Sequence, residues 1–293
     1  MPNYSIIHKQ DIFITEKYSP DIGKDGLGFL SRSFERHFNE RPYLDHTCYL
    51  FLTKTTRERS RQQSNWNTLC RKFLVPKEIQ DRETLERFME SVGQFESIVN
   101  DSGLVRLERL STEEITGTED GPGVIERYLT LSADGSVMLQ DMQLNPDEMR
   151  IGNKRLCLHT LSDLDDLPGR VRTDGRYERL STDRSDCRLS YASPVGIMLP
   201  CDHIYNQWIF IDDSGENLAR FEKTAKNMQS LSRYSRSNQI NKEWLDEYLN
   251  VAHTNGLQSV RCHCNVIAWA ESGDELRRVK NDVGSALALM ECT

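Results

Sequence analysis

Apolar residues along this chain recur at two spacings, and the spacing predicts where helices and strands lie. Five stretches repeat an apolar residue every three or four positions, which is typical of helices with one buried face. The predicted helices end near residue 39, span 81–100, 218–228 and 240–252, and begin at Ser272. Shorter runs rich in β-branched and aromatic residues predict strands at 4–15, 47–54, 104–110, 203–211 and 260–269, with a strand-rich meander over 137–163.

Polar stretches between these elements predict loops. Residues 55–72 are rich in Arg, Ser and Gln, and residues 163–194 mix six arginines with seven acidic residues without clear periodicity. Two β-α-β-like halves result. We therefore expect an α+β fold, with mixed sheets packed against amphipathic helices and compatible with ferredoxin-like elements. Residues 1–135 would form the first subdomain, and residues 136–293 the second, which includes the long polar loop 163–194.

The composition fits a globular protein with its own core. The 293 residues are 37% hydrophobic and 28% charged, and the formal net charge is −8. This acidic balance argues against a protein whose whole surface binds nucleic acid by charge. The sequence has neither a run of about 18 apolar residues nor a secretory signal pattern at its start. We therefore expect a soluble protein in the cytoplasm, where its eight cysteines are free thiols.

The two standard nucleotide-binding motifs are missing from the sequence. A Walker A loop requires G-x-x-x-x-G-K-[ST], but Gly23-Lys24 is followed by Asp25 and lacks the upstream glycine. The G-x-G-x-x-G pattern fails as well, because Glu126 stands at the third glycine position after Gly121 and Gly123. The chain is therefore not expected to bind a nucleotide by either route.

The cysteine and histidine positions give weak signals for catalysis or metal binding. Zinc needs four ligands, and Cys262, Cys264, Cys201 and His203 could supply them. Strand alternation instead places Cys262 and Cys264 on one face with Val266, which favours buried core thiols. A hydrolase would need a nucleophile, a base and an orienting acid, but the seven histidines are scattered and no G-x-S-x-G occurs. We therefore assign no catalytic, cofactor-binding or metal-binding residue, and zinc remains a rival hypothesis.

Two segments are locally basic despite the acidic total. Residues 57–72 carry a net charge of +4 and residues 220–242 a net charge of +5. Arginine beside an aromatic ring can form a platform for single-stranded nucleic acid, whereas the alternative is a solvated helix face that contacts another protein. The candidate interaction surface comprises Arg57, Arg59, Arg61, Arg179, Arg184, Arg188, Arg233, Tyr234 and Arg236.

Several long segments together resemble one protein family. They include FLSRSFERHFNERPYLDHTCYLFLTKTT (29–56), LNPDEMRIGNKRLCLHTLSD (144–163), LSTDRSDCRLSYASPVG (180–196), HIYNQWIFIDD (203–213) and NMQSLSRYSRSNQINKEWLDEYL (227–249). These segments resemble the N-terminal region of the TraG-family conjugative transposon ATPase, which is similar to the large VirB-type ATPase of type IV secretion. The resemblance covers nearly the whole chain, although none of the matching strings is a chemical motif.

The resemblance implies a fold, a role and a missing part. In this family a motor domain with Walker A and Walker B motifs follows the N-terminal region, so we expect the chain to be a fragment of an ATPase. ATP and Mg²⁺ would bind only in that motor domain. The N-terminal region would be a non-catalytic α+β module that docks to inner-membrane subunits of the conjugation channel and self-associates. It would lie on the cytoplasmic side, peripheral to the inner membrane. The runner-up role is contact with single-stranded nucleic acid in the same machinery.

Overall fold

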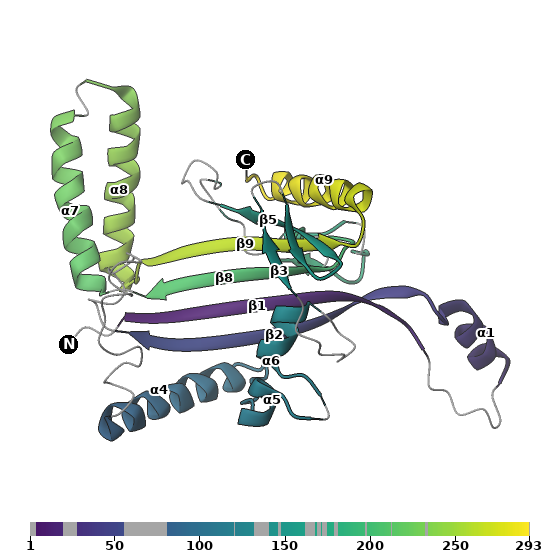
Figure 1. Cartoon of the computed structure of the whole chain (residues 1–293). Helices are drawn as coiled ribbons and strands as arrows, with labels where there is room; N and C mark the ends of the chain where they lie inside the picture. Colours follow the sequence, from purple (N-terminus) through teal and green to yellow (C-terminus); the bar gives the residue numbers. More distant parts are fainter. Residues whose placement is uncertain are drawn as a thin grey trace. The chain divides into compact units, whose positions relative to one another are not determined.

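The computed structural model shows an α+β protein (Figure 1). It describes residues 4–19, 28–55, 81–119, 121–131, 141–145, 148–161, 168, 171, 175–178, 181–196, 198–211, 213–231 and 234–292. The helices are α1 (Phe29–Phe38), α4 (Arg82–Asp101), α5 (Thr112–Thr116), α6 (Val124–Thr130), α7 (Ser214–Leu231), α8 (Arg236–Asn255) and α9 (Gly273–Leu289). The α+β class predicted from the sequence is therefore confirmed.

The strands form one large sheet and one small hairpin. The seven-stranded sheet has the order β2-β1-β8-β9-β5-β4-β3, and β6 pairs only with β7 among the described strands. Their bounds are β1 (Tyr4–Lys17), β2 (Pro42–Thr55), β3 (Met142–Leu144), β4 (Met149–Ile151), β5 (Lys154–Thr160), β6 (Gly175–Arg176), β7 (Arg188–Leu189), β8 (His203–Ile211) and β9 (Val260–Ala270).

The large sheet differs from the mixed sheets that we expected in two separate halves. β4 pairs antiparallel with β3 and with β5, and β5 pairs antiparallel with β9. Figure 1 shows β1 and β9 running in one direction and β2 and β8 in the other. Because β1 and β8 are neighbours, strands from both predicted halves join the same sheet.

The chain divides into two compact units that interleave in the sequence. Unit 1 contains residues 1–8, 50–107 and 208–262, and unit 2 contains residues 9–49, 108–207 and 263–293. Unit 1 therefore carries α4, α7 and α8, whereas unit 2 carries α1, α5, α6 and α9. Each unit is assembled from three separate segments, because the long strands β1, β2, β8 and β9 contribute residues to both units.

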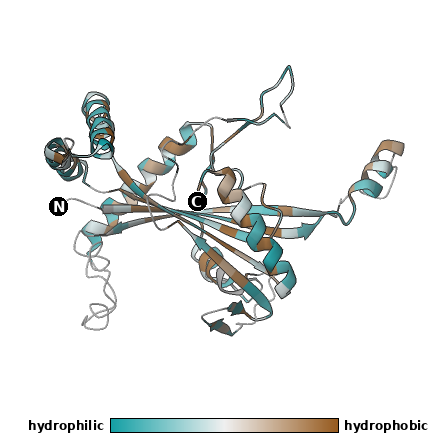
Figure 2. Cartoon of the chain, turned by 90° about the horizontal axis from the view of Figure 1, so that it is seen from above, coloured by the Kyte–Doolittle hydropathy of each residue, from teal (hydrophilic) through white to brown (hydrophobic). Residues whose placement is uncertain are grey.

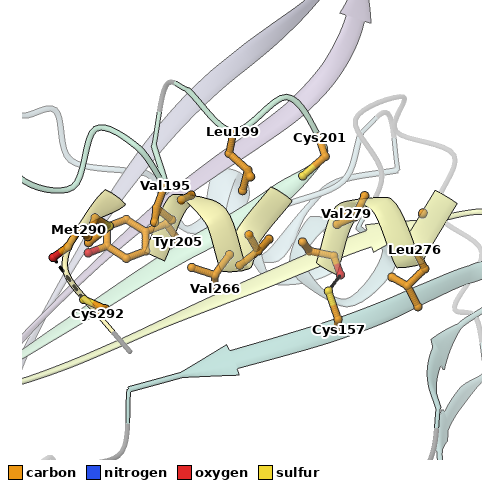
Figure 3. Close-up of a cluster of buried hydrophobic side chains, with 14 residues drawn as sticks. Cys157, Val195, Leu199, Cys201, Tyr205, Val266, Leu276, Val279, Met290 and Cys292 are labelled. Carbon is orange, nitrogen blue, oxygen red and sulfur yellow. Dashed lines mark hydrogen bonds between the residues drawn. The ribbon is translucent and has the colours of Figure 1, made fainter. Parts of the chain in front are cut away.

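Most of the described hydrophobic core lies in unit 2. Helix α9 buries one stripe, and the stripe packs against side chains of β5, β8 and β9 and of the segment that precedes β8 (Figure 3). Val195, Val283 and Ala268 are completely buried there. Apolar burial of this kind contributes about 25 cal/mol for each Å² removed from water. A second cluster surrounds Trp269 and Ile204.

Local signals explain most of the confirmed elements. The Ser272 hydroxyl accepts a hydrogen bond from the Glu275 amide at 3.2 Å and so caps α9. Ser111 and Glu114 form a capping box at the start of α5. Gly256 adopts a positive φ of 63° where α8 ends, a conformation that glycine reaches at little cost.

The strand predicted at 104–110 is wrong. These residues have no regular secondary structure, and Leu104 is 87% exposed. The side chain of Asn100, near the end of α4, instead forms two hydrogen bonds with the backbone of this segment. Its Oδ1 accepts from the Leu107 amide at 2.6 Å, and its Nδ2 donates to the Leu107 carbonyl at 3.4 Å. The backbone amide of a residue in such a turn is already hydrogen-bonded, so it cannot donate to a neighbouring strand.

Two predicted loops have different outcomes. The loop predicted at 55–72 lies outside the described residues, apart from Thr55 at the end of β2. The described part of 163–194 contains the β6–β7 hairpin, in which Gly175 lies opposite Leu189 and Arg176 opposite Arg188. A two-residue strand is too short to produce a hydrophobic alternation that sequence reading can detect.

Candidate interaction surfaces

The α7–α8 hairpin presents the candidate interaction residues of unit 1. Its two helices pack against each other (Figure 1). The rings of Phe221 and Tyr248 meet edge to face with centroids 5.5 Å apart. The Nε2 atom of His253 lies 3.2 Å from the carboxylate of Glu222. These contacts hold the two helices together from their middle to the base of the hairpin.

The turn of the hairpin and the first half of α8 expose large apolar and aromatic side chains. Tyr234 is 85% exposed and Trp244 is 63% exposed. Leu231 and Ile240 are exposed as well, and Arg236 begins α8. We call these five residues the tip surface. Because Arg236, Ile240 and Trp244 follow at intervals of four, they lie along one side of the helix.

The charges of the described hairpin are balanced. Five basic residues on α7 and α8 stand against five acidic residues, because the turn after Lys242 brings Glu243, Asp246 and Glu247. Lys242 pairs with Asp246 at 3.0 Å, and Gln239 donates to Glu243 at 3.1 Å. The strongly basic character that the sequence shows over 220–242 is therefore offset along the same helix, which weakens attraction to a phosphate backbone.

The other described residues of the predicted surface belong to unit 2. Arg184 and Arg188 belong to the β6–β7 hairpin region of unit 2, and both are exposed. Arg188 lies 3.5 Å from Asp186, which also contacts Arg176 at 3.3 Å. Tyr234 and Arg236 instead share the turn into α8 in unit 1. The predicted residues Arg57, Arg59, Arg61, Arg179 and Arg233 lie outside the described residues.

Unit 2 contains a polar cluster in which a carboxylate, an imidazole and a thiol meet. Asp11 on β1 is buried, accepts from Lys9, and lies 3.0 Å from Nε2 of His46 on β2. Burial alone raises the pKa of Asp11, but the hydrogen bonds from Lys9 and His46 outweigh it and the net pKa is lowered. Burial and the Asp11 charge raise the pKa of the Cys48 thiol to about 11.

This cluster is poorly arranged for nucleophilic catalysis. The carboxylate stands between the imidazole and the thiol, whereas an activated thiol needs the imidazole as its immediate neighbour. With a pKa of about 11, Cys48 stays protonated at neutral pH and is a weak nucleophile. The contacts bring β1 and β2 together, and we assign the cluster a structural role.

The residues of the zinc hypothesis have different environments. His203 is fully buried, its Nδ1–H donates to the Cys201 carbonyl at 2.7 Å, and Phe13 stacks on its ring at 4.5 Å. Burial raises the pKa of the Cys201 thiol to about 12, which opposes the thiolate that zinc requires. Within the described ranges no group of three or more His, Cys, Asp or Glu side chains has the geometry to hold a metal ion.

The burial predicted for the two β9 cysteines is only half right. Cys264 is partly buried and packs against the main core of unit 2, as expected. Cys262 is exposed, because burial along β9 begins only near residue 263 and becomes complete at Val266. None of the seven described cysteines forms a disulfide.

Trp244 and Ile240 are exposed, although the sequence pattern predicts a buried stripe that includes them. Their positions, 240, 244, 248 and 252, are spaced by four throughout. A helix turns about 100° per residue, so each such step drifts by about 40° and the whole set by about 120°. Ala252 at one end is buried at 1% exposure, and Trp244 has rotated outward. This constant spacing of four is the feature of the sequence that could have indicated the exposure of Trp244.

No protein-family model matches the chain, and no curated protein sequence matches it. In the described helices, none is long and apolar enough to cross a membrane.

Proposed function

We propose that this chain is a non-catalytic docking module of a conjugative DNA-transfer apparatus. In this proposal it is the N-terminal region of a TraG-family ATPase, and its tip surface binds an inner-membrane subunit of the conjugation channel. The resemblance of the segments at 29–56 and 227–249 supports the family. The exposure of Tyr234, in the turn of a packed helical hairpin, and of Trp244, in the first half of α8, is the observation that carries the docking role.

The composition of the tip surface suits a protein partner. Trp, Tyr and Arg are the residues most often found where a few side chains supply most of the binding energy. Tyr234, Arg236 and Trp244 provide one of each within eleven residues of sequence. Leu231 and Ile240 add apolar area around them, and the balanced charge of the hairpin imposes no requirement for a highly charged partner.

The same proposal gives a role to the motor domain and to self-association of the module. ATP and Mg²⁺ would bind in a separate motor domain, and this module would hold that motor at the cytoplasmic face of the inner membrane. Self-association of the module would bring several motors together. Docking through rigid helices fits this role, because helices position a contact more accurately than loops do.

A binding measurement with one substitution tests the docking role. The protein is titrated with purified small inner-membrane subunits of the channel, and the dissociation constant is compared for wild type and Trp244→Ala. Loss of a central aromatic residue costs about 2 kcal/mol or more, which is a weakening of about 30-fold. Val251→Ala serves as the matched control, because Val251 is 40% exposed on the same helix but near its base.

Two results contradict the docking proposal. One is the absence of any complex with folded wild-type protein. The other is an equal dissociation constant for wild type and Trp244→Ala, since the tip surface would then play no part in the complex.

Single-stranded nucleic acid is the second candidate partner of the tip surface. The observation in its favour is an almost fully exposed Tyr234 two residues before Arg236, since an aromatic ring beside an arginine can stack on a base. A salt titration of binding to an oligonucleotide distinguishes this role. Phosphate contacts make the affinity fall steeply with salt, with a slope close to the number of contacts. A flat slope or no binding at low salt excludes it.

A further inference from the structure

Helix α1 of unit 2 exposes its apolar side. Leu30, Phe34 and Phe38 follow at steps of four, so they stay within about 80° of one another around the axis. All three are exposed, and Leu30 is 80% exposed. The half-buried residues of the helix are instead polar, namely Ser31 and Glu35. An amphipathic helix of a globular protein normally turns its apolar side to the core, so α1 has the opposite orientation within the part of the chain that the structure describes.

The apolar side of α1 continues into a row of aromatic rings. The centroids of Phe34 and Phe38 lie 4.4 Å apart, and the ring of Tyr18 lies 6.2 Å from Phe38 and 6.2 Å from Tyr43. These four side chains are exposed and belong to neither of the two described cores. Figure 1 shows α1 beyond the end of β1 and the start of β2, and Figure 2 shows apolar and polar residues together on the helix. We call Leu30, Phe34, Phe38, Tyr18 and Tyr43 the α1 patch.

Arginines accompany the α1 patch. Arg32 and Arg36 each lie about 160° around the helix axis from Phe34, which places both on the side opposite the patch. Arg41 lies over the ring of Phe38, 5.9 Å from its centroid. Phenylalanine and leucine on one side of a helix and arginine on the other are typical of helices that lie in the plane of a membrane surface. Tyrosine is enriched at the same depth.

We propose that the α1 patch inserts into the surface of an anionic lipid bilayer. A helix is about 10–12 Å across, and an interfacial helix sinks its apolar side by about 5–10 Å. Arg32 and Arg36 would then lie among the headgroup phosphates. A groove on a protein partner would cover the apolar side equally well, but it would give these two arginines no role.

The local charge supports an anionic surface as the occupant. Residues 28–43 contain three arginines and two glutamates, a net charge of +1, although the whole chain carries −8. Basic residues beside an inserted helix are attracted to anionic lipids. The inference stands on α1 in unit 2, so the docking of channel subunits to the tip surface in unit 1 does not depend on it.

Sedimentation of the full chain with lipid vesicles tests the proposal. The vesicles consist of phosphatidylcholine with or without phosphatidylglycerol. We expect wild type to bind both kinds at low salt, and to bind the vesicles that contain phosphatidylglycerol about fivefold more strongly, because one net positive charge near an anionic surface contributes about that factor.

Substitutions of one exposed residue distinguish insertion from a non-specific effect. Leu30→Ser should weaken vesicle binding about tenfold, because it removes one inserted apolar side chain. Leu30→Trp should bind at least as strongly as wild type, since tryptophan favours the membrane interface. Its added fluorescence should shift to shorter wavelength when vesicles are present, a gain that a misfolded variant would not show. Ile98→Ser, which removes a 71% exposed apolar side chain from α4, should bind vesicles like wild type.

Several outcomes overturn the proposal. They are a wild type that binds neither kind of vesicle, equal binding of both kinds, and a Leu30→Ser variant that binds like wild type. Self-association of the wild type without lipid that is lost in Leu30→Ser would also overturn it, because a second copy would then cover the α1 patch. A failure here with unchanged binding of channel subunits to the tip surface would remove this inference alone.

Discussion

Helices α9 and α8 look alike in sequence but differ in what covers them. Both have apolar residues every three or four positions, and both are four to six turns long. Helix α9 buries Leu276, Val279, Val283 and Ala286, whereas α8 buries only Leu249 and Ala252. An amphipathic pattern therefore establishes that a helix forms, but it does not establish that its own chain covers the apolar side.

The spacing within each stripe accounts for the difference. On α9 the apolar positions alternate between steps of three and four, and they stay within about 80° of one another around the axis. On α8 every step is four, so the positions 240, 244, 248 and 252 spread over about 120° around the axis, and Trp244 and Ile240 among them are exposed. We expect Trp244 and Ile240 to be covered by another molecule because their own chain does not bury them.

The largest expected effect on stability comes from a Leu→Ala substitution in a covered helix, compared with the same substitution in an uncovered helix. Leu276→Ala on α9 removes a side chain that is 8% exposed in the main core, and Leu30→Ala on α1 removes one that is 80% exposed. The first should lower the free energy of unfolding by about 2–5 kcal/mol. The second should change it by less than about 0.5 kcal/mol. Urea unfolding monitored by circular dichroism gives both values, and equal losses would mean that α1 is covered after all.

The pH dependence of stability should be smaller and should come from the core of unit 2. Burial lowers the pKa of His203 below its ordinary value of 6.5, so the folded state keeps the ring neutral. The unfolded state takes up the proton first as the pH falls. The contribution of His203 is therefore complete above pH 6.5 and is lost below it, by up to about 1.4 kcal/mol for each unit of lowered pKa.

The variant His203→Phe isolates this contribution. It keeps a ring next to Phe13 but has no titrating group, so stability should fall less steeply between pH 7 and pH 5 than in wild type. His159, whose pKa is also lowered by burial, remains in both proteins and accounts for a residual slope. If stability falls equally steeply with pH in the variant and in wild type, His203 is excluded as a source of the pH dependence.

A cap comparison gives the smallest expected effect. Ser272 caps α9 with its side chain, whereas Ser235 stands at the start of α8 without a side-chain hydrogen bond. Ser272→Ala should therefore lower the free energy of unfolding by about 1 kcal/mol. Ser235→Ala should leave it nearly unchanged, and thermal unfolding of both variants checks this. A larger loss of unfolding free energy from Ser235→Ala than from Ser272→Ala would contradict the assignment of Ser272 as the cap of α9.

Sequence reasoning succeeded where the information is local. Ser272 at the start of α9 and the apolar stripe of α9 each specify their element within a few residues, and these predictions are confirmed. The join of β1 to β8 could not be predicted, because pairing between residues about 200 apart leaves no local signal. The strand prediction for the segment after α4 was wrong for a related reason, since the side-chain amide of Asn100 competes with strand pairing.

The candidate site was predictable only in part. Tyr234 and Arg236 were identified because an aromatic residue between basic residues is visible in the sequence. Trp244 was assigned to the core because its exposure depends on how far the stripe has rotated. Exposed apolar residues are thus the class that sequence patterns place least well, although they matter most for docking.

Amide hydrogen exchange of the whole chain, with and without the channel subunits, tests the central claim most directly. The subunits should slow exchange in the tip surface, from Leu231 to Trp244, and leave α9 unchanged, since α9 is already covered. A complex that forms without slowing exchange anywhere between Leu231 and Trp244 would contradict the assignment of the tip surface as the docking site.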